Sequence, residues 1–109
     1  MKNNEVYLKH IIEAIEKIAR YINEENLESF KKNDLVLDAV TRELEIIGEA
    51  ACNISQDFQE KYSNVPWGKM IGMRNRLIHE YFGTDRDIIW ETCQTDLKEL
   101  KGLIIKLLG

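Results

Sequence analysis

The feature that most constrains the fold of this chain is a repeated seam of apolar residues. In each of three stretches, apolar residues alternate three and four positions apart. The seams are Leu8, Ile11, Ile15, Ile18 and Ile22; Leu37, Val40, Leu44, Ile47, Ala51 and Ile54; and Trp90, Cys93, Leu97, Leu100, Ile104 and Leu107. This spacing places the apolar residues on one face of an α-helix. Such a face must be buried, so the pattern predicts amphipathic helices that pack against one another.

The seams predict helices over about residues 5–24, over residues 34–54, and from residue 85 to near the C-terminus. A further helix is expected between Pro66, which suits a first helical position because it lacks an N–H, and Gly83, a natural helix stop. Residues 26–33 and 55–65 should connect these helices, the latter with a short helical turn. No stretch alternates as a strand would, so the sequence predicts an all-α, up-and-down bundle of four main helices.

Length and composition favour one domain over residues 1–109, because 44% of the 109 residues are hydrophobic. No run is long enough to span a membrane, and the first residues lack the apolar core of a secretion signal, so we expect a cytoplasmic protein. Cys52 and Cys93 fall within helical patterns and should be buried free thiols. The net charge of −4 argues against an extensive nucleic-acid surface but allows a site that grips one phosphate.

Reactive side chains are densest in the third predicted helix, which carries Arg74, Asn75, His79 and Tyr81. At about 100° per residue, Arg74 falls inside the apolar side of this helix, and Tyr81 lies above it two turns later. A charge in that position is costly unless it is paired or used. His79 lies about 140° around the helix from Arg74, on a polar stripe with Gly68, Gly72 and Asn75. A site that uses Arg74 and His79 together therefore belongs at a junction where a second surface covers this helix.

These side chains suit cleavage of a phosphodiester bond without a metal. The arginine fork matches phosphate oxygens, and a histidine can transfer protons near neutral pH. The alternative is an ion-paired Arg74 and a His79 that is merely a satisfied polar residue, and spacing alone leaves both open. Glu49 is either part of a solvated charged edge or reaches Arg74 or His79 and orients it. His10 is expected to be a partly exposed residue without a role.

A metal or cofactor site is not expected. The two histidines lie far apart in the sequence, and no H-x3-H or cysteine–histidine cluster is present. The chain also lacks the glycine-rich P-loop of nucleoside triphosphatases.

The pattern Arg74-Asn75-x-x-x-His79-x-Tyr81 resembles the R-x4-H-x-Y motif of HepT-like toxins, which belong to the HEPN superfamily of helical ribonucleases. The flanking residues 72–73, 82–83 and 89–91 and the stretch Ile47-Gly48-Glu49-Ala50 are similar too. The resemblance implies a HEPN-like bundle and a metal-independent endoribonuclease toxin that cleaves RNA. Arg74 and His79 would form its catalytic pair, and Asn75 would help to position them.

The same resemblance implies a homodimer with the site at or near the subunit interface. It also implies an MntA-like nucleotidyltransferase antitoxin that transfers AMP to Tyr81, in an assembly that could be a larger hetero-oligomer. A different interpretation is a non-catalytic helical module that binds a nucleotidyltransferase or a nucleotide, with Arg74 only clamping phosphate. A purely structural bundle is a third interpretation, which the placement of Arg74 on an apolar side disfavours.

Overall fold

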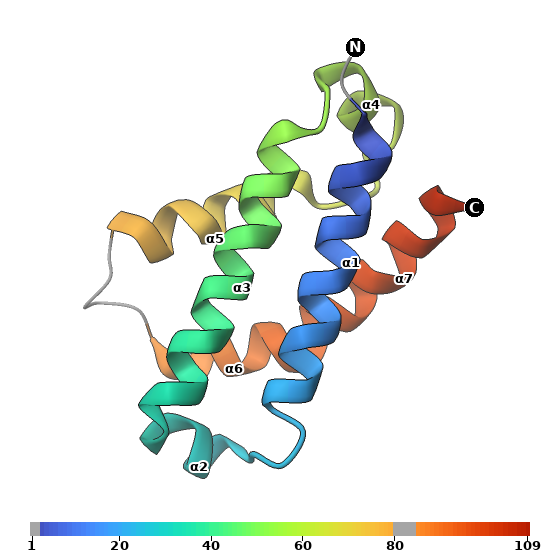
Figure 1. The fold of residues 1–109 in the computed structure, drawn as a ribbon. Coiled ribbons are helices and arrows are strands. Elements are labelled where there is room, and N and C mark those ends of the chain that lie inside the picture. The colour runs from blue at the N-terminus through green and yellow to red at the C-terminus, as the bar shows by residue number, and fades with distance from the viewer. Residues whose placement is uncertain (1–2, 80–84) are drawn as a thin grey trace.

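The computed structural model describes residues 3–79 and 85–109, and every regular element within these ranges is helical (Figure 1). The elements are α1 (Asn4–Tyr21), α2 (Leu27–Lys32), α3 (Asp34–Asn53), α4 (Gln56–Lys61), α5 (Trp67–His79), α6 (Arg86–Glu91), the π-helical turn η1 (Thr92–Asp96) and α7 (Leu97–Leu108). The prediction of an all-α fold is confirmed. The predicted helix stop at Gly83 lies outside the described residues.

The long helix α3 is the centre of the arrangement. Figure 1 shows α1 and α3 running antiparallel side by side, with α5 and the α6–α7 segment crossing behind them. Helix α3 contacts α1 on one side and α5 on another, and α7 packs against α1. The three predicted seams form the core of this bundle. All their residues are buried except Leu37, Trp90 and Leu107, which are partly buried.

The segment 26–33, predicted to be a plain connection, contains a helix of its own. Helix α2 begins with a capping box, in which the side chains of Asn26 and Ser29 each accept a hydrogen bond from the other residue's backbone N–H. This arrangement satisfies two N–H groups that would otherwise lack partners. Phe30 then anchors the short helix, because it is fully buried and its ring lies 5.2 Å from that of Trp90. The short turn expected within residues 55–65 is helix α4, capped by Ser55.

The last predicted helix is interrupted at its centre. Residues Thr92–Asp96 form a π-helical turn between α6 and α7, where one extra residue is accommodated in the helical ladder. The hydroxyls of Thr92 and Thr95 donate to the carbonyls of Ile88 and Glu91, four residues earlier, each at 2.8 Å. Side-chain donors of this kind compete for backbone acceptors and bend helices, which the apolar spacing alone does not reveal.

Helix α5 buries a narrower face than its sequence predicts. Trp67, Met70 and Leu77 are buried, but Ile71 is only partly buried and Ile78 is 46% exposed. The reason is that α5 packs mainly against α3, so one stripe of its surface is covered and the rest faces outward.

The two cysteines differ in burial. Cys93 is buried in the π-helical turn, and desolvation raises the pKa of its thiol to about 12. Cys52 is exposed, so the prediction that it is buried is wrong. It follows the seam residue Ala51, and a step of about 100° around α3 turns it out of the core.

None of the described helices is both long and apolar enough to cross a membrane.

Candidate functional site

The site is built where α5 crosses α3, at a glycine. A Cβ atom placed on Gly48 would lie 2.3 Å from Arg74 Cβ and 2.7 Å from the carbonyl oxygen of Met70. Only glycine fits at this position, and because it has no side chain the two helices can touch. A Cβ on Gly68 or Gly72 would meet no described atom within 4 Å, so the space beside these two glycines is open in the single chain.

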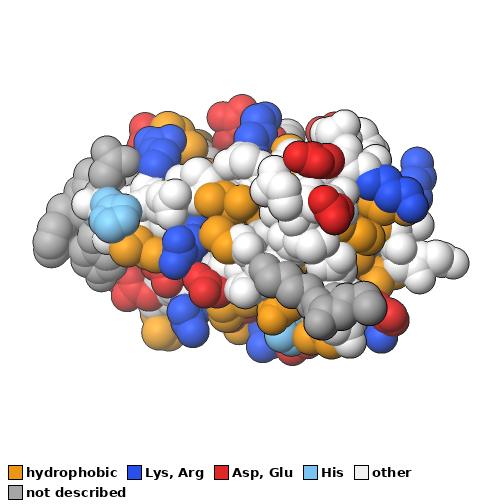
Figure 2. Space-filling view, turned by 90° about the horizontal axis from the view of Figure 1, so that it is seen from above, with side chains coloured by type: hydrophobic (Ala, Val, Ile, Leu, Met, Phe, Trp, Pro, Cys, Tyr) orange, Lys and Arg blue, Asp and Glu red, His pale blue; other side chains and the backbone are white. Residues whose placement is uncertain are grey.

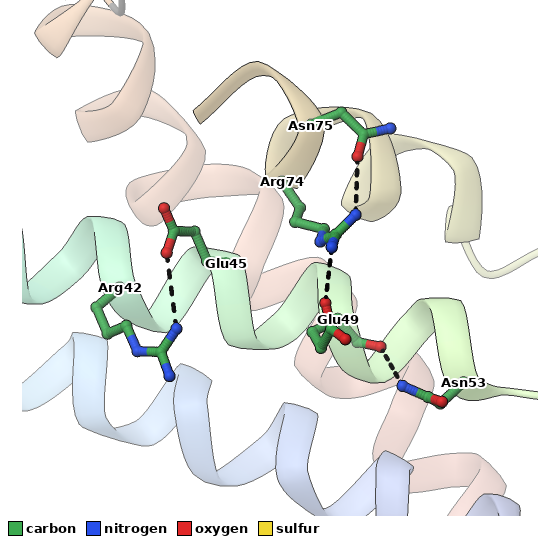
Figure 3. A network of polar contacts seen from close by, with 6 residues as sticks. All are labelled: Arg42, Glu45, Glu49, Asn53, Arg74 and Asn75. Carbon is green, nitrogen blue, oxygen red and sulfur yellow. Dashed lines mark hydrogen bonds and ion pairs between the residues drawn. The ribbon is translucent and has the colours of Figure 1, made fainter. Parts of the chain in front are cut away.

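Beside the contact between α3 and α5, the guanidinium of Arg74 lies between two side-chain oxygen atoms. Figure 3 shows Arg74 reaching from α5 to α3, where its Nη2 lies 2.9 Å from Glu49 Oε2. Its Nη1 donates to Asn75 Oδ1 at 3.0 Å. The Arg74 side chain is only 29% exposed, whereas that of Glu49 is 60% exposed. The arginine is therefore paired, as a cation on an apolar side must be, and its direction is set from two sides.

Arg74 faces a cleft of about 380 Å³ between α1, α3 and α5, which we call the Arg74 cleft. The side chains of its polar lining come from three helices: Tyr7, His10, Arg42, Glu45, Glu49, Asn53 and Arg74. Arg42 pairs with Glu45 at 3.7 Å along α3 (Figure 3). The rings of Tyr7 and His10 meet edge to face, with their centres 6.0 Å apart. Their spacing of three residues on one helix was the only signal in the sequence for this pair.

His79 is exposed near the end of α5 and does not line the Arg74 cleft. Asn75 could have contacted His79 one turn away, but its side-chain oxygen accepts from Arg74. One chain therefore joins Arg74 to Asn75 and Glu49, whereas His79 lies outside the cleft, about 140° around the helix from Arg74. Tyr81 lies outside the described residues, so its predicted place above Arg74 remains a prediction.

A second cavity, of about 340 Å³, lies on the other side of α5. Its walls are mostly apolar, from Leu44, Ile47, Met70, Met73 and Leu97. Lys69, Arg76 and Asp96 also line it, but its described lining includes no histidine, so the Arg74 cleft, which places His10 and Arg74 in one cavity, is the better candidate for chemistry.

The surface charge is mixed. On the face shown in Figure 2, basic and acidic side chains are interspersed and no broad basic patch forms. Within the described ranges, no group of three or more His, Cys, Asp or Glu side chains could hold a metal ion. On this face, recognition of a polyanion would therefore rely on individual lysine and arginine side chains.

Comparison with known proteins identifies the family to which this chain is similar. A family model described as Ribonuclease HepT-like matches residues 11–107. A Thermococcus cleftensis protein named Probable ribonuclease HepT is 42% identical over 106 residues, covering 97% of this chain and 96% of that protein. A Caldanaerobacter subterraneus protein named as a candidate RNase is 42% identical over 108 residues, covering 99% and 96%.

A Methanocaldococcus jannaschii protein, named as both a gamma-glutamylcyclotransferase and a candidate RNase, is 40% identical over 107 residues. The match covers 98% of this chain and 48% of that protein, so the chain spans about half the length of this relative. No solved structure gives a significant match. The family match extends over most of the chain and the relatives are more than a third identical, so this chain belongs to the ribonuclease HepT-like family.

Proposed function

We propose that this protein is a metal-independent endoribonuclease with Arg74 and His79 as its catalytic pair. The observation that carries the proposal is the placement of Arg74. Its guanidinium is held by Glu49 and Asn75 and faces an open cleft. A structural ion pair would not need a cleft beside it. A preorganised cation beside an open cleft is what stabilisation of a phosphorane-like transition state requires.

The reaction follows from the two side chains. The ribose 2′-oxygen forms a bond to the adjacent phosphorus as the bond from phosphorus to the 5′-oxygen breaks. The 2′-hydroxyl loses a proton and the leaving 5′-oxygen gains one; His79 accepts the first proton or supplies the second, and a water molecule carries out the other transfer. Arg74 hydrogen-bonds the non-bridging oxygens, on which charge increases. The products are a 2′,3′-cyclic phosphate and a 5′-hydroxyl end.

A homodimer accounts for the separation of the two catalytic groups within one chain. A second copy docked on the open face of α5 would bring a His79 and an Arg74 to one shared site. Gly68 and Gly72 lie on this helix, and the space beside each is open in the single chain. Such a face accepts another helix at close range.

Purified protein should cleave single-stranded RNA in excess EDTA and leave cyclic phosphate ends. Arg74→Ala and His79→Ala should each abolish cleavage, with an unchanged helical circular dichroism spectrum. Arg20→Ala is the matched control, because Arg20 is an exposed arginine outside the Arg74 cleft. Inhibition by EDTA that magnesium reverses, or full activity of Arg74→Ala, would refute the mechanism.

We further propose that the protein is the toxin of a toxin–antitoxin pair, silenced by an MntA-like nucleotidyltransferase that attaches AMP to Tyr81. An adenylate phosphate near Arg74 would occupy the guanidinium that RNA needs. Tyr81→Phe should keep its nuclease activity in the presence of the partner enzyme and ATP, whereas the unmodified sequence should lose activity and gain one adenylate mass. Full silencing of Tyr81→Phe, with no adenylate found elsewhere, would contradict this regulation.

A non-catalytic binding module is the alternative function. Two observations favour it: the Glu49 carboxylate already neutralises Arg74, and His79 lies outside the Arg74 cleft in a single chain. In that case Arg74→Ala would weaken binding of a nucleotide or of a nucleotidyltransferase, and the purified protein would cleave no RNA.

A further inference from the structure

The Arg74 cleft contains side chains that the catalytic proposal does not use. Tyr7 and His10 project from α1, and Arg42 lies on α3 two turns before Glu49. Tyr7 is half-buried, while His10 and Arg42 sit at the surface. An aromatic pair beside an arginine is the combination that binds single-stranded nucleic acid, through base stacking and phosphate contact.

We propose that the Arg74 cleft binds one nucleotide of single-stranded RNA next to the scissile phosphate, with its base on Tyr7 and His10 and its far phosphate on Arg42. This subsite rests on the proposed ribonuclease function, because Arg74 would hold the scissile phosphate at one end of the cleft. Its volume of about 380 Å³ lies at the small end of ligand pockets, which suits one nucleotide.

The geometry of the aromatic pair supports the base contact. The two ring planes are 88° apart, so they form a corner rather than a closed stack. A flat base can lie against one ring while its edge meets the other. Single-stranded RNA can insert an unstacked base into such a corner, whereas the bases of a duplex are held in the helix.

The separation along α3 between Arg42 and Glu49, which pairs with Arg74, supports contacts to two different phosphates. Arg42 and Glu49, the partner of Arg74, are seven residues apart on α3, which is about 10 Å along the helix axis. Arg42 would therefore reach a different phosphate from the one on Arg74. The cleft can accommodate the nucleotide between those two phosphates.

The acidic residues in the cleft do not prevent binding. The Arg42–Glu45 pair is long, at 3.7 Å, and the Arg42 side chain is 70% exposed. The Glu45 side chain is 25% exposed, but a long pair whose cation is in solvent contributes little stability, so Arg42 can leave it at small cost. A phosphate offers Arg42 a stronger, bidentate set of charge-assisted hydrogen bonds.

The phosphate contact is tested with a fluorescent 2′-O-methyl RNA oligonucleotide, which can bind but cannot be cleaved through a 2′-hydroxyl. Anisotropy titrations over a range of salt concentrations should show that Arg42→Ala weakens binding. The slope of log affinity against log salt should fall by about 0.7, the value for one phosphate contact with a single strand. Arg20→Ala should match the original protein, and Glu45→Gln should bind more tightly because it frees Arg42.

The base contact is tested with the same oligonucleotide. His10→Ala and Tyr7→Leu should each weaken binding about fivefold or more, as expected when one stacking contact is lost. Tyr21→Leu is the control for Tyr7→Leu, since Tyr21 is also half-buried on α1 but does not line the cleft. Circular dichroism should confirm that each variant remains folded.

Two results would overturn the subsite. The first is unchanged binding by Arg42→Ala and His10→Ala, and the second is an equal loss in the Arg20 and Tyr21 controls. If RNA cleavage still requires Arg74 in either case, the proposed function stands without the subsite. If the original protein neither cleaves RNA nor binds the oligonucleotide, both proposals fail.

Discussion

At the scale of single residues, the most informative contact is the one between Arg74 and Glu49. The carboxylate lies 2.9 Å from the guanidinium and comes from a different helix, so it sets the arginine's direction from outside α5. Glu49 is more than half exposed, and an ion pair of that kind adds at most about 1 kcal/mol to the stability of the fold. Its value to the protein must then lie in positioning.

We therefore predict that Glu49→Ala lowers kcat for RNA cleavage by about 10- to 100-fold, because small misplacements of a catalytic group cost that much. KM and the thermal midpoint of unfolding should change little. Glu49→Gln, which keeps a hydrogen-bond acceptor, should recover part of the rate. Glu13→Ala is the control, since Glu13 forms an exposed ion pair with Lys17 outside the Arg74 cleft. A Glu49→Ala variant that is faster than the original would mean that the carboxylate competes with substrate.

At the scale of helices, the crossing of α3 and α5 depends on Gly48. The absent side chain allows Arg74 Cβ and the Met70 carbonyl to approach α3 more closely than a Cβ would permit. Glycine in a helix interior costs about 1 kcal/mol relative to alanine, so the contact must offset that cost. The backbone carbonyl of Met70 cannot rotate away as a flexible side chain could.

We predict that Gly48→Ala destabilises the protein, although alanine is the better helix former. Separating the two helices should cost about 1–3 kcal/mol, as overpacking of a core does. Gly102→Ala is the matched control within α7, where a Cβ meets nothing within 4 Å and alanine should stabilise by up to about 1 kcal/mol. Urea unfolding of both variants decides the matter, and a stabilised Gly48→Ala would show that the helices adjust without strain.

The helices and much of the core could be predicted from the sequence, because apolar spacing reports directly which face is buried. The seam of Leu8, Ile11, Ile15 and Ile18 is buried as expected. Spacing does not report which neighbour covers a face. The sequence therefore left His10 without a role and did not reveal that the close contact between α3 and α5 lies at Gly48. Features that depend on local hydrogen bonds, such as the π-helical turn at Thr92–Asp96, were also missed.

At the scale of the whole molecule, the candidate site is divided. Arg74 lines a cleft formed with α1 and α3, whereas His79 is exposed near the end of α5 and outside that cleft. A two-fold symmetric dimer presents the same patch from both copies, so one helix end can complete the site of the other.

Gly72→Leu should weaken such a dimer by crowding the open face of α5, and sedimentation velocity would detect the shift towards monomer.

The division of the site can be tested by mixing two inactive proteins. In a shared site, Arg74→Ala supplies an intact His79 and His79→Ala supplies an intact Arg74, so a mixed dimer regains one complete site. Random exchange of equal amounts should restore roughly a quarter of the original RNA cleavage, because half of the dimers are mixed and each has one of two sites intact. Adding Arg74→Ala to an Arg74→Ala, His79→Ala double variant should restore nothing. If the mixed dimers form but remain inactive, Arg74 and His79 must act within one chain, and α5 would have to rearrange when RNA binds.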